Sequence, residues 1–210
     1  MDITSPSYGL VVGSIPAGGV NKLKRCVMEI GKKLLDRQVL ETKYKNARGN
    51  LLVVLAFTAI NIVLLVTQSD TYFLFSAYIP YALVSVGMIL CGMFPAEYYG
   101  EEFAGVEFYS SSIFAVFLAV AIVIMALYLI SWIFSKKKKV GWMIFALVLF
   151  AIDTAGMLII EGIALDSIFD IAFHVWVIVS LIQGIKAYSK LKKLLEEQVE
   201  ILEEEQQIDS

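Results

Sequence analysis

The sequence predicts an all-α integral membrane protein: a helical bundle with four full spans and one re-entrant or interfacial helical segment. Composition is the first observation behind this fold class. The 210-residue chain is 59% hydrophobic and only 18% charged, whereas a soluble domain is about 45–50% apolar and about 25% charged. The second observation is that the apolar residues form long runs, and about 20 apolar residues of helix cross a bilayer.

These runs place a transmembrane bundle over residues 47–189. Its four spans are predicted at about 50–67, 112–134, 140–160 and 167–187. Asn61 is the strongly polar residue of the first span, and we expect it to hydrogen-bond a neighbouring helix.

The distribution of basic residues predicts the orientation of the spans. Nine Lys and Arg lie in 22–48, four in 136–139 and four in 186–193. Basic clusters next to spans mark the cytoplasmic side of a membrane. Both termini are therefore predicted to be cytoplasmic, and the acidic segments 97–107 and 161–166 are predicted to face outward.

A further apolar run, 72–94, conflicts with this orientation if it crosses fully. The chain must pass from inside at Arg48 to outside at Glu97, which needs an odd number of crossings, yet two apolar runs lie between these points. We expect 72–94 to enter and return, because Pro80 should break its helix and a broken backbone is tolerated where protein shields it. The alternative is five full spans, with one end placed against the charge rule.

The regions outside the bundle carry different patterns. Residues 1–19 are expected to form a mobile tail. Residues 20–46 predict a cytoplasmic basic amphipathic helix, which contacts either anionic lipid or a partner helix. Residues 190–210 continue the helical stripe into a charged tail, with a coiled-coil signal of barely two heptads.

Four strings carry a resemblance to a known family: SDTYFLFSAYIPY, FPAEYYGEE, IFSKKKKVGW and IALDSIFDIAFHVWVIVSLI. Over roughly residues 46–193 the chain resembles an uncharacterised family of small multi-pass membrane proteins from Gram-positive-type bacteria. The resemblance implies a bacterial plasma membrane. It implies no activity and no catalytic residue, since the family has none established.

One group of polar residues inside the spans is a candidate site. A charged side chain in a span is costly to insert, so Asp153 needs a partner. From a turn near residue 165, Asp153 lies 12 residues before and His174 lies 9 after, which places them within about 5 Å in depth. By the same count Glu161 and Asp170 are neighbours at the outer edge.

Three interpretations of this group remain open. In the first, Asp153 joins two helices and the other groups are hydrated. In the second, Asp153 and His174 form an ion or proton pathway. In the third, a divalent metal binds His174 and Asp170 with Asp166 or Glu161, although no tight motif fixes such a site.

The sequence excludes several function classes. It contains no HExxH, GxSxG, Walker or GxGxxG motif, so we expect no cofactor and lean against an enzyme. Nucleic-acid binding is not expected, because the basic clusters flank spans, and Cys26 and Cys91 are expected to be free thiols. We predict an accessory or scaffold protein that contacts the bilayer and either a second copy or another membrane protein. The alternative is a small ion, proton or solute transporter or channel that uses Asp153 and His174.

Overall fold

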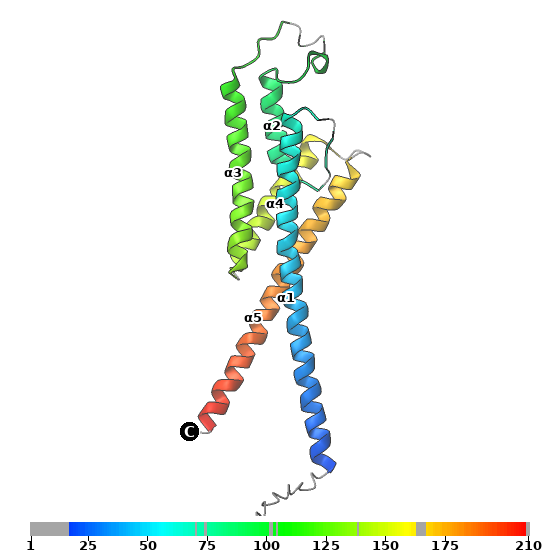
Figure 1. Ribbon diagram of the computed structural model, residues 1–210. Helices are drawn as coiled ribbons and strands as arrows, with labels where there is room; N and C mark the ends of the chain where they lie inside the picture. Colours follow the sequence, from blue (N-terminus) through cyan, green and yellow to red (C-terminus); the bar gives the residue numbers. More distant parts are fainter. Residues whose placement is uncertain are drawn as a thin grey trace, which may run out of the picture. The chain divides into compact units, whose positions relative to one another are not determined.

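The computed structural model describes residues 17–69, 71–73, 75–100, 103, 105–137, 139–162 and 167–208. Regular structure within these residues is helical throughout, which confirms the predicted all-α class (Figure 1). The elements are α1 (Ala17–Val66), α2 (Tyr78–Leu90), the short 3-10 helix η1 (Ala96–Tyr98), α3 (Ser111–Lys136), α4 (Val140–Ile160) and α5 (Ile168–Ile208).

The chain divides into two compact units, one ending at Val39 and one comprising Leu40–Ser210. The described part of the first unit is helical. Five of its larger apolar side chains are more than half exposed, namely Val27, Met28, Ile30, Leu34 and Leu35, and Val39 is 44% exposed. Of the predicted tail 1–19, residues 1–16 lie outside the described residues, and 17–19 belong to α1.

Among the described residues, four helices are long and apolar enough to cross a membrane. They are Val27–Val66, Ser111–Lys136, Val140–Ile160 and Ile168–Glu200, and they include the four runs predicted as spans. α2 is apolar but has only 13 residues, which gives a length of about 20 Å. A hydrocarbon core is about 30 Å thick, so a straight α2 is too short to cross it.

In the second unit, α3, α4 and α5 follow one another as antiparallel neighbours, and α2 packs against α3 and α4 (Figure 1). Two apolar clusters hold this unit together. The larger one centres on fully buried side chains of α1, α4 and α5, among them Leu51, Phe150 and Leu181. The smaller one joins the end of α1 to α2 and α3 through residues such as Leu65, Met88 and Ala121.

Two glycines fix the position of α2. A Cβ atom on Gly87 would lie 2.9 Å from Cβ of Phe117, so the missing side chain permits the close approach of α2 to α3. Gly92 has a φ of +63° and ends the helix in a Schellman motif. In this motif the Met93 N–H donates to the Met88 carbonyl at 3.0 Å.

The expectation that Pro80 breaks a helix is wrong. α2 begins at Tyr78, which makes Pro80 the third residue of the helix. The N–H groups of a first turn have no acceptor within their own helix, so proline costs no hydrogen bond there. The interruption of helical structure lies earlier, between Val66 at the end of α1 and Tyr78 at the start of α2.

Candidate functional site

The segment 71–77, which enters α2, is held by polar side chains of α1. The side chain of Asn61 pairs with the backbone of Phe73: its Oδ1 accepts from the N–H at 2.9 Å, and its Nδ2 donates to the carbonyl at 2.6 Å. The hydroxyl of Thr58 accepts from the Ala77 N–H at 2.8 Å. The sequence predicted that Asn61 would hydrogen-bond a neighbouring helix. It binds the extended segment before α2 instead.

The same segment contains an unfavourable backbone conformation. Phe75 has a φ of +79°, in the left-handed region that bulky side chains avoid. Such a residue costs about 1–3 kcal/mol and persists where its surroundings fix it. Here the Phe75 ring packs edge-on against Phe173 of α5, with a centroid distance of 4.7 Å.

Asp153 of α4 receives the start of α2. Its Oδ2 accepts from the Tyr78 N–H at 2.9 Å, and its Oδ1 accepts from the Ile79 N–H at 2.8 Å. A helix N-terminus has unpaired N–H groups and a partial positive charge, so it is a natural site for an anion. The carboxylate of Asp153 is the anion at this site, and its residue is 1% exposed.

His174 of α5 is the third partner of this carboxylate. Its Nε2 lies 3.3 Å from Oδ2 of Asp153, and its Nδ1 lies 2.8 Å from the carbonyl oxygen of Asp170. A carbonyl can only accept, so Nδ1 carries a hydrogen. Nε2, the other ring nitrogen, faces the Asp153 carboxylate.

The Asp153–His174 pair lies well inside the bundle. Asp153 is seven residues before the last residue of α4, which is about 10 Å from that helix end. The imidazole of His174 is 2% exposed and stacks on the Phe150 ring at 5.0 Å. The structure thus brings together Asp153 and His174, whose depths were matched by counting residues.

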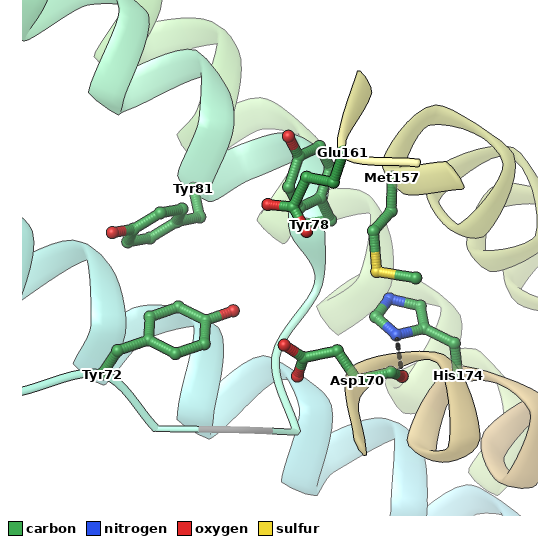
Figure 2. Close-up of a pocket in the computed structure, with 7 residues that line it drawn as sticks. All are labelled: Tyr72, Tyr78, Tyr81, Met157, Glu161, Asp170 and His174. Carbon is green, nitrogen blue, oxygen red and sulfur yellow. Dashed lines mark hydrogen bonds between the residues drawn. The ribbon is translucent and has the colours of Figure 1, made fainter. Parts of the chain in front are cut away.

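A pocket lies next to His174, between the end of α4 and the start of α5 (Figure 2). Its volume is about 200 Å³. Segment 71–77, α2, the end of α4 and the start of α5 contribute the residues that line it: Tyr72, Tyr78, Tyr81, Met157, Glu161, Asp170 and His174. Of the four predicted site residues, three therefore line the pocket. Asp153 does not, although its Oδ2 lies 3.3 Å from Nε2 of His174.

The polar groups that line the pocket are two carboxylates, three phenols and the imidazole of His174. In Figure 2 the carboxylates of Glu161 and Asp170 both point toward the side where the tyrosines lie. The rings of Tyr72 and Tyr81 meet edge-on at 5.1 Å. Desolvation raises the pKa of Tyr72 to about 12, and the charges of Asp170 and Glu161 act in the same direction. Tyr72 is therefore neutral at physiological pH.

The described residues give little support to the hypothesis of a metal site. No group of three His, Cys, Asp or Glu among them could hold a metal ion. Asp166, one of the predicted ligands, lies outside the described residues. Both ring nitrogens of His174 face protein oxygen atoms, so neither is directed at a metal.

The opposite, basic end of the bundle is tied by polar contacts as well. The Tyr44 hydroxyl donates to the Ser135 carbonyl at 2.8 Å, and Arg48 Nε donates to the Ser135 hydroxyl at 3.0 Å. Between this end and the Asp153 pair lies Tyr128. Its buried hydroxyl has no hydrogen-bond partner among the described residues.

Sequence reasoning missed the principal partners of Asp153 and the role of Thr58. Backbone N–H groups occur at every residue except proline, so no sequence pattern marks Tyr78 and Ile79 as donors. A threonine in an apolar helix usually bonds its own helix, as Thr58 also does to the Val54 carbonyl. Comparisons with known proteins add no further residue: no family model, curated protein or solved structure matches this chain.

Proposed function

We propose that this chain is a non-enzymatic, multi-pass membrane protein that binds a small solute in the pocket beside residues 71–77, as a transporter or channel does. The pocket is the observation that carries the proposal. It has a volume of about 200 Å³ and is lined by polar groups from four separate parts of the fold. Small-molecule sites are cavities with a few polar groups that fix the ligand, usually of about 300–1,000 Å³, so a pocket of this size suits a small solute.

The topology that goes with this proposal has four spans and a re-entrant segment. α2 is about 20 Å long, and its first residues contact Asp153 within the bundle. Irregular backbone at membrane depth is tolerated where protein surrounds it, and discontinuous helices form the sites of many transporters. The basic end of the bundle and both termini would face the cytoplasm, in a bacterial plasma membrane as the resemblance implies.

In this proposal Asp153 is a positioning residue. Its oxygen atoms accept hydrogen bonds from two backbone N–H groups and approach the His174 ring. An anion held in this way fixes the start of α2 and is poorly suited to carry a proton or cation along a path. Solute contact falls to the residues that line the pocket, including His174.

A second candidate, an accessory or scaffold protein, is supported by features outside the pocket. α5 extends to Ile208, and a Lys192–Glu196 ion pair at 3.3 Å lies on this extension. Such a helix could pair with a second copy as a short coiled coil. The exposed apolar side chains of 27–39 could lie on anionic lipid or on a partner protein.

The orientation is tested by single cysteines in a chain from which Cys26 and Cys91 have been removed. Val106 is exposed in the acidic loop, and Lys137 is exposed at the basic end of α3. In intact cells, a membrane-impermeant thiol reagent should label Val106→Cys, while Lys137→Cys should require permeabilisation. Labelling of both, or of neither, in intact cells would contradict four spans with a re-entrant segment.

Access to the pocket separates solute binding from a scaffold role. Met157 and Met143 are both buried on α4, at 2% and 1% exposure, but only Met157 lines the pocket. A small methanethiosulfonate reagent should therefore modify Met157→Cys from outside and leave Met143→Cys unmodified. Equal protection of both cysteines would mean that solutes do not enter, and the scaffold role would then be preferred.

A further inference from the structure

The charge of the pocket is the first indication of its ligand. Glu161 and Asp170 both line it. The chain has no Lys or Arg in residues 49–135 or 140–185, which include every part that lines the pocket. Among the residues that line the pocket, only His174 has a basic side chain, and its Nε2 faces the Asp153 carboxylate at 3.3 Å. The pocket therefore carries excess negative charge and favours a cation.

The aromatic lining is a second indication, independent of charge. Tyr72, Tyr78 and Tyr81 all line the pocket. The face of an aromatic ring attracts an ammonium group through its quadrupole, and cages of such rings recognise organic ammonium ions. Met157 adds a soft apolar surface that suits a short carbon chain.

The remaining ligand classes fit less well. The natural anion site, the N-terminus of α2, is filled by the carboxylate of Asp153. Divalent metals need more oxygen or nitrogen ligands than two carboxylates supply, and the described residues contain no group of three. Resting on the solute-binding function proposed above, we infer that the pocket binds a small organic ammonium ion, with Glu161 and Asp170 balancing its charge and tyrosine rings facing its cationic head.

The test compares two impermeant reagents of opposite charge at Met157→Cys in the full-length, otherwise cysteine-free chain. One is trimethylammonium-ethyl methanethiosulfonate, and the other is sulfonatoethyl methanethiosulfonate. The ratio of their rates is divided by the same ratio at Val106→Cys in the exposed loop, so that the intrinsic reactivity of the two reagents cancels. We expect the cationic reagent to be favoured in the pocket by about tenfold, the size of effect that partly screened charges at pocket distances produce.

Charge variants link this preference to the two carboxylates. Glu161→Gln and Asp170→Asn should each lower the normalised ratio several-fold. Glu107→Gln is the matched control: it removes an acidic residue from an exposed loop position outside the pocket. Because Glu107 is next to the reference position 106, its effect is read at Met157→Cys before normalisation, where the ratio should stay unchanged. Propylammonium should also protect Met157→Cys from modification, while propanol and propionate, of the same chain length, should not.

The outcomes separate this inference from the function on which it rests. Modification of Met157→Cys by both reagents at a normalised ratio near one would overturn the cation preference and leave a solute pocket in place. Protection by propanol or propionate equal to that by propylammonium would overturn it in the same way. Modification by neither reagent would remove the solute-binding function as well.

Discussion

Replacing Asp153 with Asn should loosen the start of α2 without creating a cavity, because the two side chains have nearly the same shape. In the unchanged protein the two backbone N–H groups lie 2.8 and 2.9 Å from the carboxylate oxygens. The amide of the variant keeps one oxygen, which can accept from only one of them. Its NH₂ group then faces the other N–H, so two donors oppose each other. His174 also loses the negative charge 3.3 Å from its ring.

The magnitude follows from these losses. A buried donor left without an acceptor costs about 1–3 kcal/mol, and the loss of a hydrogen bond to a charged group costs about 1.5–3 kcal/mol. The two costs overlap, since Oδ2 serves both Tyr78 and His174. We expect a loss of about 3 kcal/mol, which corresponds to a fall in Tm of about 10 °C for a chain of this size.

The assay is thermal unfolding of the purified chain in detergent, with Thr154→Val as the matched control. Thr154 is the next residue of α4, and its hydroxyl donates to the Phe150 carbonyl in the same helix. Its replacement should change Tm by no more than about 2 °C, since both groups belong to one helix. A Tm for Asp153→Asn equal to that of the control would refute the view that this carboxylate fixes α2.

Two further substitutions test other contacts of segment 71–77 and α2. Thr58→Val removes the acceptor of the last N–H before α2 and should lower the stability by about 1–2 kcal/mol. Thr67 is the control, because its hydroxyl bonds only its own helix. Thr67→Val should therefore have a smaller effect in the same melting assay. Gly87→Ala places a Cβ 2.9 Å from a neighbouring side chain and should cost about 1–3 kcal/mol; Gly141→Ala has open space at its Cβ and should be neutral or stabilising. Equal Tm values within either pair would contradict the contact concerned.

The sequence predicted the long helices well, because each is encoded locally. Lysine-free apolar runs of about 20 residues specify a spanning helix whatever its neighbours are. The similar depths of Asp153 and His174 also followed from the sequence, since two helices joined by a short turn rise equally per residue. Whether the two side chains face each other depends on the rotation of each helix about its own axis. Counting residues from the turn does not predict that rotation.

The rest of the site depends on contacts between parts far apart in the chain. The main hydrogen-bond donors to Asp153 are backbone N–H groups, and such groups occur at nearly every residue. The prediction for Pro80 was wrong for a related reason. The effect of a proline depends on where its helix starts, and the start of α2 is capped by a carboxylate from α4. The pocket likewise arises only when segment 71–77 is folded back beside α4 and α5.

The capping of α2 by α4 also bears on the order in which the protein is made. Asp153 lies 75 residues after Tyr78, so at 5–20 residues per second the ribosome reaches it roughly ten seconds later. During that interval α2 has no acceptor from α4 for its first two N–H groups. The start of α2 can therefore take its final place only after α4, the third long apolar helix, has been made. Biogenesis of this protein is thus vulnerable late, and chains truncated before residue 153 should be recognised as unfinished and degraded.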